Sequence, residues 1–264
     1  MDIITNAVYF GIAGAIIMFL FNIFHCIFAV IFGVRIEKFG MLYNIGNRSF
    51  LTFKRNHTEY MLGWIPTGGY VKISGMIDES MDGESMEIKD YMLLSKPPIV
   101  RFICTAGAPI LLIIPFIISA SFIYETNSLN EGFQALNVVI NNLYQYGIGA
   151  IDSTQAVANW NAIASSYNVF SIILCIMALF IAFSTMIMLL ITTTAFKKFK
   201  IVLVFTVLYY AFLLYLLYIV GSLYFSLHSF TDAILAVLKY TVTIFIISFV
   251  LLVLIKMMPK NKYF

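Results

Sequence analysis

The chain has 264 residues, of which 61% are hydrophobic and only 11% are charged. Soluble domains carry about 25% charged residues, so a single water-soluble core is excluded and lipid must surround much of the chain. The net charge of +3 is too small to indicate a nucleic-acid partner. The three cysteines each lie in an apolar run, which is typical of buried free thiols rather than of a disulfide framework.

Five apolar stretches are long enough to cross a bilayer, which requires about 20 consecutive apolar residues. They cover residues 7–32, 102–124, 169–195, 201–227 and 233–255. The first is too long, and its flanks are too poor in basic residues, for a cleaved signal peptide. The sequence therefore predicts an all-α polytopic membrane protein with about five transmembrane helices, which form a single membrane domain over residues 1–264.

Basic residues alternate between the segments that connect the spans. Nine Lys or Arg residues lie between the first two spans and three lie between the third and fourth, whereas the other two connections have none. Because basic residues stay on the cytoplasmic side, residues 33–101 are expected to form a cytoplasmic loop and residues 125–168 an extracytoplasmic loop. The N-terminus is then outside and the C-terminus is cytoplasmic. The usage of Asn, Ile and Lys is typical of AT-rich bacterial genomes, so we expect a bacterial inner membrane.

The cytoplasmic loop is predicted to contain a small membrane-associated β element. Residues 33–40 alternate in the manner of a strand, and residues 63–73 carry a proline and paired glycines followed by a second alternating run. We expect residues 65–73 to form a hairpin with Gly68 and Gly69 at its turn, because tight turns favour glycine. One strand would be an exposed edge, covered either by a partner or by the chain's own residues 44–55. Residues 78–90, which are acidic, are expected to form a solvated loop, and residues 125–168 are too few for another ordinary domain.

Four segments, in order, resemble the bacterial site-2 proteases, which are intramembrane zinc metalloproteases. They are residues 33–39 (Gly-Val-Arg-Ile-Glu-Lys-Phe), residues 65–72 (Ile-Pro-Thr-Gly-Gly-Tyr-Val-Lys), residues 95–97 (Ser-Lys-Pro) with Arg101, and residues 106–109 (Ala-Gly-Ala-Pro). The resemblance covers about residues 20–125, and the rest of the chain resembles the family only in its span pattern. In the second span, Pro109 and Pro115 each remove a helical hydrogen bond, and we expect the first span to pack closely against Gly107.

The catalytic residues that the resemblance implies are mostly missing. The family's first span carries His-Glu-x-x-His, in which two His bind zinc and the Glu is the general base. The corresponding segment here has Phe21 in place of the first His and Asn22 in place of the Glu, and only His25 remains. A phenyl ring cannot bind zinc, and an amide cannot accept a proton from zinc-bound water at neutral pH. The family's third ligand is an Asp of the third span, and the chain has no Asp, Glu or His between Ser153 and Leu227.

Asn22 and His25 are therefore interpreted as a vestige of the catalytic motif. Catalytic zinc requires about three protein ligands, so we expect no metal site, no cofactor and no catalytic residue. We expect His25 to be a buried, neutral histidine that is bonded to Asn22 or to a Ser or Thr of a neighbouring helix.

The resemblance then implies a binding function, because the loop is retained while the metal ligands are lost. We expect a non-catalytic relative that binds a partner membrane protein, through its transmembrane or extended juxtamembrane segment, or that is a subunit of a membrane complex. In the resembling proteases the substrate adds a strand to this loop, which makes the expected partner-binding residues Ile65, Pro66, Gly68, Gly69, Tyr70, Val71 and Lys72. Lipid is the other expected partner. Two alternatives are an active intramembrane metalloprotease with a relocated metal site, and a transporter or channel component, although no internal repeat of the transporter kind is present.

Overall fold

The computed structural model describes residues 3–46, 48–75, 88–192, 199–226 and 228–257. The chain divides into two compact units. The helix–sheet unit comprises Gly14–Leu112 and Thr241–Phe264, and the helical unit comprises Met1–Ala13 and Ile113–Tyr240. Most of residues 78–90, and both Lys197 and Lys198, lie outside the described residues, so the expectations for the acidic loop and for these two basic residues are not addressed.

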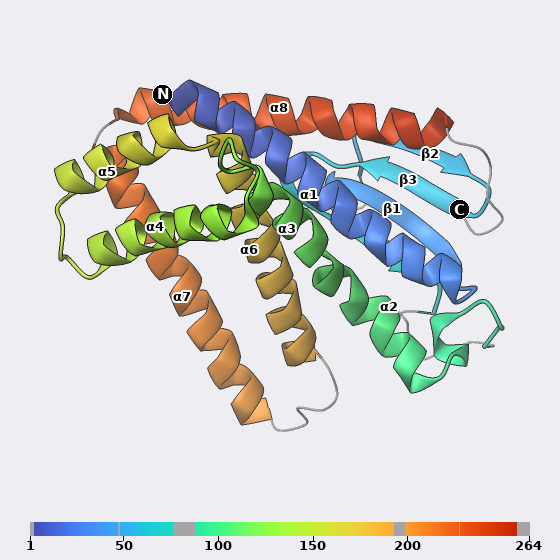
Figure 1. Ribbon diagram of the computed structural model, residues 1–264. Helices are drawn as coiled ribbons and strands as arrows, with labels where there is room; N and C mark the ends of the chain where they lie inside the picture. Colours follow the sequence, from blue (N-terminus) through green and yellow to red (C-terminus); the bar gives the residue numbers. More distant parts are fainter. Residues whose placement is uncertain (1–2, 47, 76–87, 193–198, 227, 258–264) are drawn as a thin grey trace. The chain divides into compact units, whose positions relative to one another are not determined.

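The helix–sheet unit holds a four-stranded sheet with the order β2-β3-β1-β4 (Figure 1). The strands are β1 Ile36–Tyr43, β2 Leu51–Arg55, β3 Thr58–Leu62 and β4 Ile65–Ile73. Strand β1 pairs with β3 in parallel and with β4 in antiparallel orientation, and β2 pairs with β3 in antiparallel orientation. Both edges of the sheet are therefore known: β2 forms one and β4 the other.

Apolar side chains of β1, β3 and β4 contribute to the core of this unit. Phe39, Met41, Tyr60, Leu62 and Ile73 are all buried, and in β1 the burial is continuous from Phe39 to Leu42. The C-terminal part of α1 (Ile3–Ile31) belongs to the same unit. So do the short helix η1 (Leu93–Ser95) and α2 (Pro98–Leu111), which begins with a proline in its first turn, where the missing N–H is not needed.

The helical unit contains α3 Ile113–Ser121, α4 Leu129–Gly147, α5 Ser153–Ser166, α6 Val169–Thr192 and α7 Phe199–Phe225. It also contains the first part of α8 Phe230–Met257. Helices α3 and α4 approach closely at Gly132, where an added Cβ would lie 1.9 Å from the carbonyl oxygen of Ala120. Asp152 caps α5, since its carboxylate accepts a hydrogen bond from the backbone N–H of Gln155 at 2.8 Å.

Five helices among the described residues are long and apolar enough to cross a membrane, which confirms the predicted number. They are Asn6–Ile31, Pro98–Ser121, Val169–Ile187, Thr206–Phe225 and Phe230–Met257. Their surfaces carry many exposed large apolar side chains, such as Leu214, Leu217 and Tyr218 on α7. Side chains of this kind require lipid or another protein rather than water.

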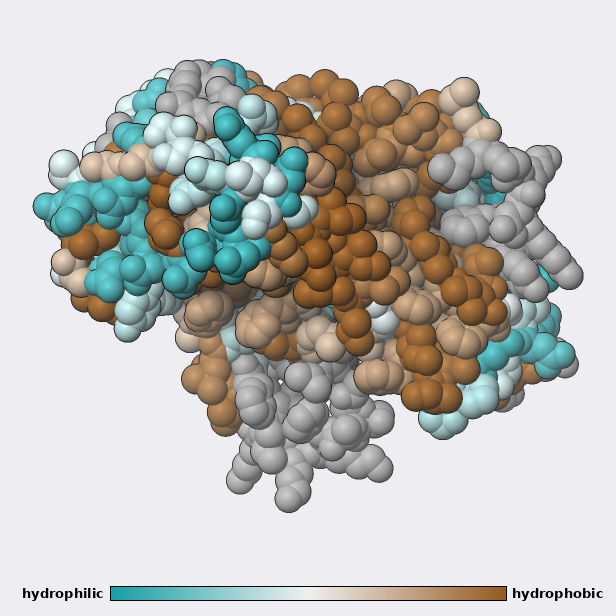
Figure 2. Space-filling model, viewed as in Figure 1, coloured by the Kyte–Doolittle hydropathy of each residue, from teal (hydrophilic) through white to brown (hydrophobic). Residues whose placement is uncertain are grey.

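The segment of residues 125–168, which was expected to be an extracytoplasmic loop between the second and third spans, contains two helices, α4 and α5. Figure 2 shows hydrophilic residues gathered over this helix pair. The buried residues of α4 include Gly132, Ala135, Leu136 and Val139. Their spacing of three and four residues is the helical signal that the polar composition obscured.

The hairpin expected at residues 65–73 is a single strand, β4. Gly68 has a φ of +69°, as the turn hypothesis required, but it forms a bulge opposite β1 rather than a reversal of the chain. The aromatic ring of Tyr43 occupies the space where a Cβ of Gly68 would lie. The pairing partner is β1, which lies about 30 residues earlier in the sequence, and such a long-range pairing has no local signal.

Candidate functional site

Asn22 lies in the part of α1 that belongs to the helix–sheet unit, and it is fully buried. Its side-chain Nδ2 donates a hydrogen bond of 3.0 Å to the backbone carbonyl of Gly40 in β1. Its Oδ1 is buried and has no hydrogen-bond partner among the described residues. The residue that stands where the resembling proteases have a general base therefore links a helix to the sheet, with one polar atom left unsatisfied.

His25 lies one turn further along α1. Its Nδ1 is 3.1 Å from the backbone carbonyl oxygen of Cys104 in α2. A carbonyl oxygen can only accept a hydrogen bond, so Nδ1 carries the proton and is the donor. The expectation that His25 bonds to Asn22, or to a Ser or Thr, is therefore wrong, because the amide of Asn22 is directed to the sheet and the main chain of α2 supplies the acceptor. The ring of Phe21 packs edge-on against the imidazole, with 4.7 Å between the ring centroids.

Helices α1 and α2 approach closely beside this histidine. A Cβ added at Gly107 would lie 2.4 Å from the ring of Phe28, so only glycine allows this separation. This confirms the expectation that the first span packs against Gly107. The close approach explains how His25 reaches a backbone carbonyl of α2.

The residues at this position do not fit a zinc ion. Of the three side chains that correspond to the family's motif, only His25 is a metal-binding type, while Phe21 and Asn22 pack against neighbouring groups. No cluster of three or more His, Cys, Asp or Glu side chains suited to a metal ion occurs among the residues that the structure describes. Because a catalytic zinc requires about three protein ligands, no hydrolytic step through a metal is derived for this site.

Strand β4 carries all seven of the residues that the sequence predicted to contact a partner. It lies at the edge of the sheet. Residues 69–73 and Ile65 are in register with β1, whereas residues 66–68 have no paired residue there. Ile65 is 41% exposed, and the preceding Trp64 is 49% exposed. The strand therefore presents a partly exposed backbone with a large aromatic side chain at one end.

Several β4 side chains already have partners within the unit. The hydroxyl of Tyr70 accepts a hydrogen bond of 3.2 Å from the side-chain amide of Asn44. Burial raises the pKa of this hydroxyl, and the nearby carboxylate of Glu59 raises it further. Lys72 forms an ion pair of 3.5 Å with Glu37 in β1. These two side chains hold β4 in place, which leaves its backbone as the group best suited to a new contact.

Asn22 of the motif lies next to Gly69 of the glycine pair, a contact that the sequence did not predict. A Cβ added at Gly69 would lie 2.9 Å from Nδ2 of Asn22 and 2.8 Å from the carbonyl oxygen of Gly40. The absence of a side chain at Gly69 therefore allows the amide of Asn22 to reach β1. Trp64 was also missed as part of this surface, although a tryptophan directly before the Ile-Pro-Thr-Gly-Gly segment was a visible signal.

Comparison with protein families agrees with this geometry. A family model described as Peptidase family M50 matches residues 9–260, which is nearly the whole chain and includes the spans that carry no motif. No curated protein sequence gives a match. Since the match extends far beyond half of the chain, the protein belongs to peptidase family M50, the site-2 protease family.

Proposed function

We propose that this member of peptidase family M50 is non-catalytic, and that it binds an extended segment of a partner membrane protein along the free edge of β4. Its helices and its family membership support a membrane protein. The loss of catalysis is supported by the chemistry of Phe21 and Asn22, which supply neither a zinc ligand nor a general base.

The observation that carries the proposal is the place of β4 in the sheet. It is an edge strand, and residues 66–68 lack an opposite residue in β1. An edge strand presents backbone N–H and C=O groups that an extended peptide can pair with. At a membrane surface such groups are costly to leave without partners, which favours a segment that stays bound over one that visits briefly.

The chain's own residues 44–55 were the alternative to a partner at this edge, but their strand does not pair with β4. Within that segment, Leu51–Arg55 forms β2, which pairs with β3 at the opposite end of the sheet. Among the described residues, no strand pairs with the outer edge of β4, which supports its use by a partner.

Trp64 and Ile65 extend the proposed contact at the start of β4. Tryptophan is enriched among the residues that dominate binding energies, because it buries a large area at a small entropic cost. The ring of Phe50 packs edge-on against Trp64 at 5.0 Å between centroids, and it also contacts Phe245 at 4.8 Å. This aromatic group holds the indole in place for a partner.

We further propose that this sheet lies on the cytoplasmic side of a bacterial inner membrane, with the N-terminus outside; the charge alternation of the connecting segments supports this orientation. A partner segment that reaches β4 would then be a cytoplasmic juxtamembrane stretch of a membrane protein. The bound state makes this chain a subunit of a membrane complex rather than a hydrolase.

The test compares two substitutions at one exposed position, Thr67. Thr67→Pro removes a backbone donor in the unpaired part of β4, whereas Thr67→Ala keeps the donor and removes only the side chain. The tagged full chain is purified from cross-linked native membranes, and the co-purified proteins are quantified. We expect Thr67→Pro to lower recovery of the partner at least tenfold and Thr67→Ala to leave it unchanged. Equal recovery from both variants, with the protein still folded, would remove the β4 backbone from the binding site.

A further inference from the structure

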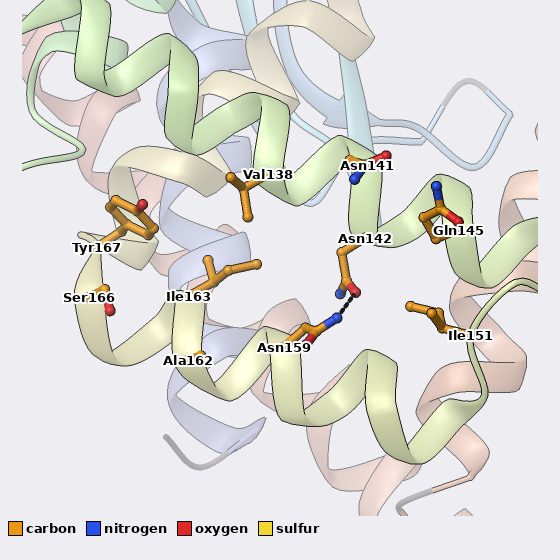
Figure 3. A pocket seen from close by; sticks show the side chains of 10 residues that line it. All are labelled: Val138, Asn141, Asn142, Gln145, Ile151, Asn159, Ala162, Ile163, Ser166 and Tyr167. Atoms are coloured by element: carbon orange, nitrogen blue, oxygen red, sulfur yellow. Dashed lines mark hydrogen bonds between the residues drawn. The ribbon is translucent and has the colours of Figure 1, made fainter.

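A groove separates α4 and α5 in the helical unit (Figure 3). Its volume is about 480 Å³, which lies within the range of about 300–1,000 Å³ that is usual for ligand sites. Figure 3 shows Val138 of α4 and Ile163 of α5 extending into the space between the two helices. Carboxamide and hydroxyl side chains, together with Ile151 and Ala162, complete the lining, so the groove is lined by both apolar and uncharged polar groups.

Hydrogen bonds between the two helices fix the groove. Asn142 is buried, and its Nδ2 donates to the backbone carbonyl of Ala156 at 3.0 Å. Its Oδ1 accepts from Nδ2 of Asn159, also at 3.0 Å. Both ends of the Asn142 amide are thus used to join α4 to α5. A groove that is rigid before binding loses little conformational entropy when a ligand enters.

The groove carries no Asp, Glu, Lys, Arg or His among its ten lining residues. This excludes a site built for an anion or a cation, since binding a charged group requires a compensating charge. Asn141 and Gln145 stand on α4 at the groove, and each carboxamide offers both donors and an acceptor. That combination matches the donor and acceptor of a peptide group.

The spacing of these two carboxamides favours an extended polypeptide. Asn141 and Gln145 are four residues apart on a helix, a rise of about 6 Å. Alternate residues of an extended chain repeat at about 6.6 Å. The two side chains can therefore pair with alternate peptide groups of one extended segment.

The groove also continues beyond the length of a small molecule. A second hollow of about 420 Å³ shares Ser166 and Tyr167 with it. This hollow has a single charged lining residue, Glu125. Two adjoining hollows suit a chain of several residues.

We infer that the α4–α5 groove is a second binding site, and that it takes an uncharged, extended polypeptide segment whose backbone pairs with Asn141 and Gln145. This site is separate from the β4 edge and does not depend on the function proposed above. Apolar side chains of the segment lie over Val138 and Ile163.

The probe is a displayed library of random dodecapeptides, selected against the full chain in lipid nanodiscs. We expect the selected peptides to lack charged residues. Their affinity should fall at least tenfold in the double variant Asn141→Leu/Gln145→Leu. Asn161→Leu, which alters an exposed asparagine of α5 outside the groove, should leave the affinity within twofold. Thr67→Pro in β4 should also leave it unchanged, so that the two proposed sites fail or succeed separately.

A second readout keeps the test decisive if a variant folds poorly. A selected peptide that carries a photoreactive residue should cross-link to α4 or α5 of the unmodified chain. The inference is overturned by cross-links that map elsewhere or by a selection that yields no binding peptide. Retained affinity in the double variant, or displacement of the peptide by a neutral oligosaccharide, would also overturn it, the latter by assigning the groove to a glycan.

Discussion

Each unit of the protein contains a buried asparagine that ties a helix to a neighbouring backbone carbonyl. In the helix–sheet unit, Asn22 donates to Gly40 at 3.0 Å, and in the helical unit Asn142 donates to Ala156 at 3.0 Å. The two differ in the other half of the amide. The Oδ1 of Asn142 accepts a hydrogen bond from Asn159, whereas the Oδ1 of Asn22 has no partner among the described residues.

We interpret the contact of Asn142 as one that serves stability, and the contact of Asn22 as one that remains from the proposed loss of a catalytic site. A buried polar atom without a partner costs about 1–3 kcal/mol, so an apolar residue at position 22 would be expected if stability alone decided. The position is instead the one where the resembling proteases have their general base. Asn22 keeps a polar group there but directs it to the main chain, and the adjacent Gly69 leaves room for it.

The largest expected effect is that of Asn22→Asp. The carboxylate loses the donor to Gly40 and places a charge against a carbonyl oxygen in a fully buried position. We expect the free energy of unfolding to fall by about 3–5 kcal/mol. Asn142→Asp removes the equivalent donor, but its groove is open to water, so we expect a loss of about 1–2 kcal/mol. Denaturant unfolding in mild detergent measures both, and equal losses would contradict the distinction between the two asparagines.

A smaller effect is expected from alkaline pH, and Tyr60 of the helix–sheet unit should contribute to it. Tyr60 is 1% exposed between Phe39 and Phe53, and burial raises its pKa to about 12. A raised folded-state pKa means that the stabilisation is complete below pH 10, the pKa of the unfolded chain, and is lost as the pH rises through about 12. A shift of about two pH units corresponds to about 2.7 kcal/mol.

The two tryptophans of the chain report the units separately, since Trp64 lies in the helix–sheet unit and Trp160 in the helical unit. In single-tryptophan variants, the fluorescence of Trp64 should show the loss of stability between pH 10 and pH 12. Tyr60→Phe should reduce this loss without abolishing it, because the pKa of Tyr70 in the same unit is also raised. If Tyr60→Phe leaves the alkaline transition unchanged, another group is responsible for it.

Two helical glycines provide the smallest and most closely matched comparison. A Cβ at Gly107 of α2 would lie 2.4 Å from the ring of Phe28, whereas one at Gly221 of α7 would meet nothing within 4 Å. We expect Gly107→Ala to destabilise the protein by about 1–3 kcal/mol through overpacking. Gly221→Ala should be neutral or stabilising by up to about 1 kcal/mol, because alanine is the better helix former. A destabilising Gly221→Ala would show that α7 is covered by a close neighbour.

The sequence predicted the elements whose signal is local. Long apolar runs predicted five spans, and the small residue at position 107 predicted the close packing of the first two. The alternation at residues 33–40 predicted β1. The sequence could not predict that Gly68 forms a bulge, because the partner strand β1 is distant along the chain. The hydrogen bond from Asn22 to Gly40 depends on the same long-range arrangement. The helical periodicity of α4 was hard to recognise because its exposed face is polar.

We propose that this M50 family member has lost its metal chemistry, and the zinc content of the purified protein provides the decisive test. The full chain is purified in mild detergent, equilibrated with zinc, passed through a desalting column and analysed for metal, together with the variant His25→Ala. We expect well below one zinc per chain in both proteins, because His25 is the only metal-binding side chain of the three at the motif. About one zinc per chain in the unmodified protein, lost in His25→Ala, would contradict it and would indicate an active protease with a relocated metal site.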